Sequence, residues 1–406
     1  MLAALRSLTV RGRAFLASGI TSIGCGLVLL ERDLVRMGLL VTALPLVAAA
    51  YVAGRSHHLK IARVASPPRL TVGESATVQV QIDNAGSSTG VLLLEEQLPY
   101  ALGGRPRFVV QPMYRSAHEL IEYSVRPEIR GRHRLGPMQV RLREPFGMVE
   151  LRQEVPGTAH LLVTPRVTPL REIKLGGGWF ASGDDHPRSF TVGNVADVVV
   201  REYRRGDDLR RVHWRSTARM GELMVRNEEQ LWQARATVVL DNRAVSHRGT
   251  GPGSSLESAV AAAASVAVHL SGLGYRVRLI TSTGITDAWH ERGRPLDPFP
   301  LLEELATLEA VRETSLPDLA LGEDLSGGII VGVLGASQVD DHSWWARFPR
   351  HSAQSLALVL DVDDWGQRST EPERFRAPAW LTSQGWRAAS LNKGASLAST
   401  WLELDR

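Results

Sequence analysis

Two long apolar runs near the start of the chain constrain its fold more than any other feature. The first, residues 14–30, carries no charge, and the second covers residues 37–54. Each run is close to the roughly 20 residues that a helix needs to cross a bilayer. A short link containing Glu31, Arg32 and Asp33 separates them, which leaves room only for a turn. The pattern predicts a transmembrane helical hairpin within residues 1–55.

The charges that flank the hairpin predict its orientation, because positively charged flanks are retained in the cytoplasm. The link has one arginine and two acids, whereas both outer flanks are basic. Both chain ends are therefore expected in the cytoplasm, with the protein in the cytoplasmic membrane. A cleaved signal peptide is the alternative for the first run, but a second apolar run follows at once and no clear cleavage site precedes it. The basic flanks are Arg6, Arg11 and Arg13 on one side and Arg55, His57, His58, Lys60 and Arg63 on the other.

Residues 56–168 show the period-two pattern of half-buried strands. Val78, Val80 and Ile82 alternate with polar neighbours, and several further short apolar segments are separated by turn residues. Short strands at this spacing predict a small antiparallel all-β sandwich. We expect this domain to serve as a spacer or an interaction module.

Residues 233–406 alternate differently. An apolar strand at 236–241 precedes Ser254 and Glu257, which have the spacing of a capping box, and an alanine-rich helix that ends near Gly272. Apolar strands continue to alternate with helices, which predicts a doubly wound α/β sheet of parallel strands. Ligands of such sheets bind at the carboxyl ends of the strands, so the loop after Asp241 is the candidate binding region.

Residues 169–232 form a linker that carries an arginine-rich motif. Gly206 breaks the chain, Asp207 and Asp208 can cap a helix, and Gly221 ends it. Asp207 precedes Arg210 by three residues, so the two side chains lie on one side of that helix. The motif consists of Arg201, Tyr203, Gly206, Asp207, Arg210, Trp214, Arg219, Met224 and Arg226.

This motif resembles the signature of a bacterial family classed as domain of unknown function fifty-eight. The resemblance extends to the hairpin, to the element at residues 144–147 and to the C-terminal α/β domain. It implies a von Willebrand factor type A-like fold for that domain and a MoxR-type AAA+ ATPase as partner. Proteins of this kind are regarded as adaptors in the assembly or maturation of other proteins, often at the cell envelope, without established catalytic activity.

Two interpretations of the motif remain open. It can be a docking surface for a partner. It can equally be a buried polar network that joins two domains, since buried arginines need defined acceptors. We expect Asp207 to be such an acceptor in a partly buried network.

The loop after Asp241 is also where a type A domain would bind a metal ion. Metal-binding type A domains use an Asp-x-Ser-x-Ser loop, because a hard divalent cation needs several oxygen ligands. Here Asp241 is present, but Arg243 and Val245 stand at the two hydroxyl positions, and Ala336-Ser337 offers no aspartate after the strand at 327–335. We therefore interpret Asp241 as the remnant of a degenerate site, and expect no tightly held magnesium.

Enzyme signatures are not recognisable in this sequence. There is no Gly-x-Ser-x-Gly elbow, Walker A loop or His-Glu-x-x-His pair, so neither catalysis nor a cofactor is predicted. The expected function is that of a membrane-anchored cytoplasmic adaptor, with a MoxR-type AAA+ ATPase, an unknown protein client and membrane lipid as partners. The alternatives are a membrane-tethered nucleic-acid binder, which a net charge of only +4 does not favour, and a metal-dependent type A adhesion receptor.

Overall fold

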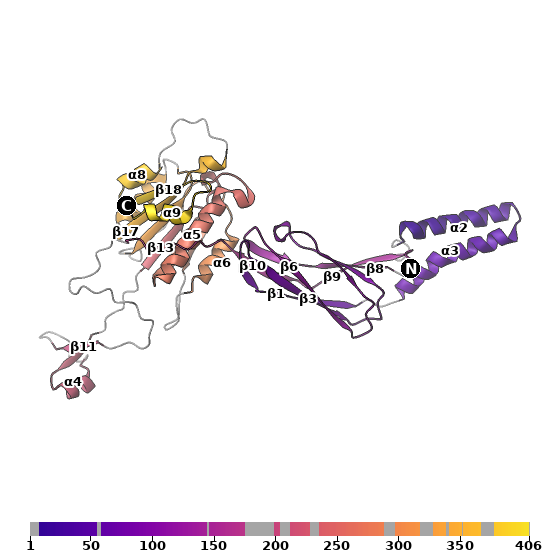
Figure 1. The fold of residues 1–406 in the computed structure, drawn as a ribbon, viewed down its shortest axis with the longest axis horizontal. Coiled ribbons are helices and arrows are strands. Elements are labelled where there is room, and N and C mark those ends of the chain that lie inside the picture. The colour runs from indigo at the N-terminus through magenta and orange to yellow at the C-terminus, as the bar shows by residue number, and fades with distance from the viewer. Residues whose placement is uncertain are drawn as a thin grey trace. The chain divides into compact units, whose positions relative to one another are not determined.

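The computed structural model describes eleven segments of the chain, which fall into two compact units (Figure 1). Unit 1 consists of residues 1–166 with 306–308, and unit 2 of residues 167–305 with 309–406. The described residues are 8–54, 58–143, 146–174, 199–203, 212–227, 235–287, 297–316, 328–337, 341–350, 352–366 and 377–405.

Unit 1 begins with two helices that lie side by side, α2 (Val10–Val28) and α3 (Arg32–Ala53) (Figure 1). Glycines allow their close approach: a Cβ atom added to Gly19 would lie 2.3 Å from Thr42 Oγ1. Among the described residues, Arg32–Val52 is the one helix long and apolar enough to cross a membrane. The apolar helix predicted near the N-terminus is therefore confirmed, and the transmembrane hairpin as a whole stays a prediction.

The other described residues of unit 1 form three sheets. The first has the order β1-β3-β6, the second β5-β4-β8-β9, and the third β2-β10-β7. Neighbouring strands are antiparallel, except that β2 and β10 are parallel. Their bounds are β1 Leu59–Ser66, β2 Arg69–Thr71, β3 Ala76–Asn84, β4 Leu92–Glu96, β5 Arg107–Val110, β6 His118–Val125, β7 Gly131–Leu135, β8 Met138–Arg143, β9 Glu150–Val155 and β10 Ala159–Thr164.

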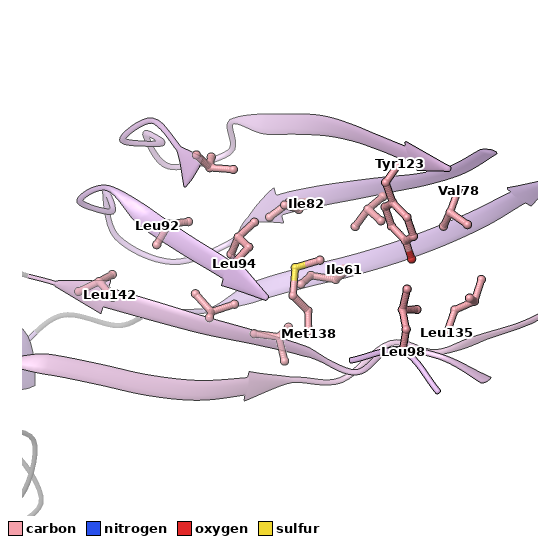
Figure 2. Close-up of a cluster of buried hydrophobic side chains, with 14 of the residues drawn as sticks. Ile61, Val78, Ile82, Leu92, Leu94, Leu98, Tyr123, Leu135, Met138 and Leu142 are labelled. Atoms are coloured by element: carbon pink, nitrogen blue, oxygen red, sulfur yellow. The ribbon is translucent and has the colours of Figure 1, made fainter. Parts of the chain in front are cut away.

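One apolar core holds these sheets together. The alternation predicted for β3 is confirmed, because Val78, Val80 and Ile82 are buried while Gln79 and Gln81 are exposed. Figure 2 shows the labelled side chains of this core gathered between the strands. Full burial of each such aliphatic side chain stabilises the fold by about 1.5–3 kcal/mol relative to exposure.

Unit 2 contains a six-stranded sheet of the order β15-β14-β13-β16-β17-β18. All neighbours in it are parallel except β14 and β15, which are antiparallel. Numbered along the chain within this sheet, the order is third, second, first, fourth, fifth, sixth. The bounds are β13 Arg235–Leu240, β14 Arg276–Thr281, β15 Gly284–Asp287, β16 Ile329–Leu334, β17 Gln354–Leu360 and β18 Arg387–Leu391.

The central strands are buried along their whole length, as expected for parallel strands covered on both faces. Helix α5 (Ser255–Gly272) begins where the sequence predicts, because Ser254 Oγ accepts a hydrogen bond of 3.4 Å from the Glu257 amide. The predicted sheet of parallel strands is confirmed. The other helices of this part are α6 Phe299–Thr307, α7 His342–Trp345, α8 Ala377–Ser383 and α9 Leu397–Glu403.

Candidate functional site

The arginine-rich motif forms a short β-α-β unit in unit 2. Strands β11 (Val199–Glu202) and β12 (Met224–Asn227) pair antiparallel, and α4 (Trp214–Met220) lies between them in the chain. The amide of Tyr203 donates to the Leu223 carbonyl oxygen at 2.7 Å, and the amide of Met224 donates to Thr217 Oγ1 at 3.0 Å. The first bond extends the pairing of the two strands, and the second ties α4 to β12.

The helix differs from the prediction at its start. His213 has φ −88° and ψ 85°, which is not helical, and its Nδ1 accepts from the Ser216 amide as the N-cap. A continuous helix from Asp207 onward is therefore wrong at Val212 and His213, because Val212 forms a β-bridge instead. The predicted end is confirmed: Gly221 adopts φ 78°, a left-handed conformation that glycine accepts without strain.

Large apolar and basic side chains are exposed on this unit. Trp214 is 70% exposed, Met220 69% and Leu223 41%. Arg215 and Arg219 are exposed as well, and no residue of α4 is buried. We call Trp214, Arg215, Arg219, Met220 and Leu223 the motif surface. Trp214 and Arg219 therefore do not sit in the partly buried network that was expected.

Some of the remaining motif residues lie in or beside β11 and β12, and the others lie outside the described residues. Met224 is buried and anchors β12, while Tyr203 is half-buried. Arg201 pairs in register with Val225, and Arg226 pairs with Val200. Gly206, Asp207 and Arg210 lie outside the described residues, and so does the predicted role of Asp207 as an acceptor.

A second group of charged residues lies at the carboxyl edge of the parallel sheet. Arg243 Nε and Nη2 donate to Asp241 at 2.9 and 2.8 Å, and Nη1 and Nη2 donate to Asp341 at 2.8 and 2.7 Å. Arg243 Nη1 also donates to the Thr314 carbonyl oxygen at 2.6 Å, and Ser246 Oγ donates to Asp241 at 2.8 Å. We call Asp241, Arg243, Ser246, Thr314 and Asp341 the Arg243 cluster.

Asp241, Arg243, Ser246 and Asp341 are buried, with 0% exposure for Arg243, whereas Thr314, which contributes its backbone carbonyl oxygen, is exposed. Burial by itself lowers the pKa of Arg243, but its hydrogen bonds to Asp241 and Asp341 outweigh this and raise the pKa. The guanidinium therefore stays charged. Two carboxylates beside one guanidinium leave the cluster with one formal negative charge.

Two features of this cluster escaped the sequence reasoning. Asp341 follows β16, where no aspartate was expected, because six residues separate it from the end of the strand. The sequence pattern shows Arg243 only as the loss of a hydroxyl ligand, whereas its side chain lies between the two carboxylates. The consecutive acids Asp340 and Asp341 were the available signal.

His247 forms hydrogen bonds with the backbone of Asp241 and with the start of α5. Its Nε2 lies 2.6 Å from the Asp241 carbonyl oxygen and its Nδ1 3.1 Å from Ser255 Oγ. A carbonyl oxygen can only accept, so we assign the neutral tautomer with the proton on Nε2. Burial lowers the pKa of His247, and burial also lowers the pKa of His269 in α5.

These lowered values predict how stability depends on pH. Because the pKa values of the folded histidines are lowered, below about pH 6.5 the unfolded histidines take up protons more readily than the folded ones. Unit 2 should therefore lose stability as the pH falls through this window, by at most about 1.4 kcal/mol per pH unit for each histidine. Urea denaturation at pH 7 and pH 5.5 measures the loss. His247→Gln should reduce it, and a variant with the full wild-type loss would show that His247 does not contribute.

Comparison with protein families matches one part of the chain. Residues 199–291 match the family model described as "Protein of unknown function DUF58". This range contains the motif surface together with Asp241, Arg243 and Ser246. The match supports the resemblance seen in the motif. No curated protein matches the chain.

Solved structures show weak likeness to parts of the chain. The CARDB domain of a Pyrococcus furiosus protein is 16% identical, with a TM-score of 0.21 over 26% of this chain and 93% of its own. An alkylpurine DNA glycosylase of Pseudomonas fluorescens is 14% identical, with a TM-score of 0.18 over 33% of this chain and 39% of its own. β-Glucosidase 3B of Thermotoga neapolitana is 14% identical, with a TM-score of 0.13 over 26% and 17%. Scores this low carry no argument about function.

Proposed function

We propose that this chain is a membrane-anchored, cytoplasmic protein-binding adaptor that works with a MoxR-type AAA+ ATPase on a protein client, and that the motif surface is its docking site. The exposure of Trp214 carries the proposal. Tryptophan, methionine and arginine are enriched in protein interfaces, and tryptophan and arginine dominate their binding energy. Trp214, Met220 and the two arginines bring these types together on one short segment.

The two helices of unit 1 support the membrane anchor. Both helices expose large apolar side chains, whereas soluble proteins rarely expose large continuous apolar patches. The helices are tied to the sheets of the same unit: Thr9 Oγ1 donates to the Gly147 carbonyl oxygen at 2.7 Å, and Val52 belongs to the apolar core. Exposed apolar residues on α2 and α3 include Ile20, Leu27, Met37, Leu39, Leu40 and Val47.

The strand order of unit 2 supports a von Willebrand factor type A-like domain as the adaptor's second part. The order third, second, first, fourth, fifth, sixth, with the third strand antiparallel, agrees with a doubly wound sheet whose crossover lies between β13 and β16. The Asp241 loop follows β13, and Asp341 follows β16.

The topology is tested by a reporter fused after Arg406. Basic residues flank the two apolar helices on the outer sides, which predicts a cytoplasmic C-terminus. A reporter active only in the cytoplasm should therefore be active, and one active only in the periplasm should be silent. The reverse result would contradict the orientation and the cytoplasmic location of the partner.

The docking site is tested by Trp214→Ala in the full chain. Loss of an interface tryptophan costs about 2 kcal/mol or more, so capture of the ATPase should fall by roughly thirty-fold. Crosslinking in native membranes followed by mass spectrometry identifies and quantifies the captured ATPase. The melting temperature should not change, because the side chain is largely exposed.

Tyr100→Ala is the matched control, since Tyr100 is an aromatic residue of unit 1 that is 93% exposed. It should leave capture of the ATPase unchanged. Equal capture by the Trp214 variant and the wild type would exclude the motif surface as the docking site. A salt-sensitive loss of bound nucleic acid in the Trp214 variant would favour the nucleic-acid alternative instead.

A further inference from the structure

The guanidinium of Arg243 has no hydrogen-bonding capacity left for a ligand. It carries five N–H groups. Two of them reach Asp241, two reach Asp341 and the fifth reaches the Thr314 carbonyl oxygen, all within 2.9 Å. The side chain is 0% exposed, so water does not compete for these bonds.

This saturated cation lies at the position where a sheet of this topology binds ligands. Asp241 directly follows β13, and Asp341 follows β16, the two adjacent strands at which the chain order reverses. The oxygens that surround the guanidinium are two carboxylates and a backbone carbonyl, with the Ser246 hydroxyl on Asp241. Carboxylate, carbonyl and hydroxyl oxygens are the ligands of hard divalent cations.

The residues present do not fit a bound metal ion, because the space between the two carboxylates is filled by a covalently attached positive group. We propose that Arg243 is a built-in cation that takes the place of a divalent metal and locks this edge of the sheet shut. The lock joins β13, the segment around Thr314 and the start of α7. The edge therefore needs no metal to keep its shape.

The charge balance gives this inference a distinctive consequence. Removing the side chain of Arg243 leaves two buried carboxylates facing each other, which is unfavourable in a region of low dielectric. A divalent cation can replace the lost positive charge and use the same oxygen atoms. Arg243→Ala is thus expected to create a cation site that the wild type lacks.

The test uses the full chain in detergent, with its melting temperature measured with and without millimolar calcium or magnesium. The wild type should not respond. Arg243→Ala should melt at a lower temperature than the wild type and regain several degrees, saturably, when calcium is added, because a ligand that binds only the folded state stabilises it. Sodium chloride at matched ionic strength should not restore it.

Two further variants make the result decisive. Arg243→Lys keeps a positive charge in the cluster and should show no calcium response. Arg243→Ala combined with Asp341→Asn removes a ligand and should lose most of the calcium response of the single variant. A saturable response of the wild type, or an Arg243→Ala protein that calcium does not stabilise or fold, would overturn the proposal. None of these measurements involves the partner ATPase, so they stand apart from the docking proposal.

Discussion

Asp341→Asn should destabilise unit 2 by about 3–5 kcal/mol, because it breaks two charge-assisted hydrogen bonds of a buried guanidinium and leaves at least one of its N–H groups without an acceptor. The asparagine side chain has nearly the same shape, so the loss reports charge and not a cavity. The asparagine side chain points either its NH2 group or its amide oxygen at Arg243. The NH2 group cannot accept a hydrogen bond from a guanidinium, which has only donors, and the amide oxygen is a weaker acceptor than a carboxylate. Urea denaturation of the full chain, followed by the fluorescence of the buried tryptophans of unit 2, measures the free energy of unfolding.

Asp287→Asn is the matched control in the same sheet. Asp287 pairs with Arg278 at 2.7 Å, but both side chains remain 22–25% exposed. Solvent still reaches this partly exposed pair and screens it, so the change should cost about 1 kcal/mol or less. A similar small loss for both variants would show that the Arg243 cluster is not the electrostatic lock that its burial indicates.

Glu96→Gln should destabilise unit 1 by about 3–5 kcal/mol, for the same physical reason in a different fold. Arg63 Nε and Nη2 donate to the two Glu96 carboxylate oxygens at 2.8 and 3.1 Å, and both side chains are fully buried. Arg63 also donates to the Gly157 carbonyl oxygen, so this pair ties β1 to β4 and to the turn before β10. Thermal or urea unfolding of the full chain, resolved by amide exchange in unit 1, measures the loss.

Glu95→Gln is the control, since Glu95 is the neighbouring residue in β4. The Glu95 side chain is only 11% exposed, but its partners Arg107 and Arg141 are 74% and 32% exposed, so solvent reaches both pairs and screens them. The expected cost is about 1 kcal/mol or less. Equal costs for the two glutamates would mean that full burial of the Arg63 pair adds no stability beyond that of a pair whose arginine is open to solvent.

The elements with strong periodicity could be predicted from the sequence. β3 alternates buried and exposed residues over its whole length, and α5 combines an N-cap serine with an unbroken alanine-rich stretch. Elements with weaker patterns were missed. β9 carries mostly polar residues, and β15 is a short antiparallel edge strand whose pattern does not differ from a turn.

The motif shows a limit of a different kind. Its rare residue types identified the segment, and Gly221 marked the end of a helix, but spacing alone did not show which side chains are exposed. The capping pattern at Asp207 predicted a helix through Val212 and His213, whereas hydrogen bonds to β12 take these residues out of the helix: the His213 amide donates to the Met224 carbonyl oxygen at 2.8 Å. Strand pairing outweighed local helix preference.

The sequence by itself determined that Asp241 lies at the carboxyl end of a buried strand in a parallel sheet, because apolar runs that alternate with helical segments are local signals. It did not determine what balances the charge of Asp241. Arg243 appeared as a lost ligand, and Asp341, 98 residues further along the chain, did not appear at all. Only the tertiary structure brings the three together, because the sheet places the ends of β13 and β16 side by side and burial then requires every charge between them to find a partner.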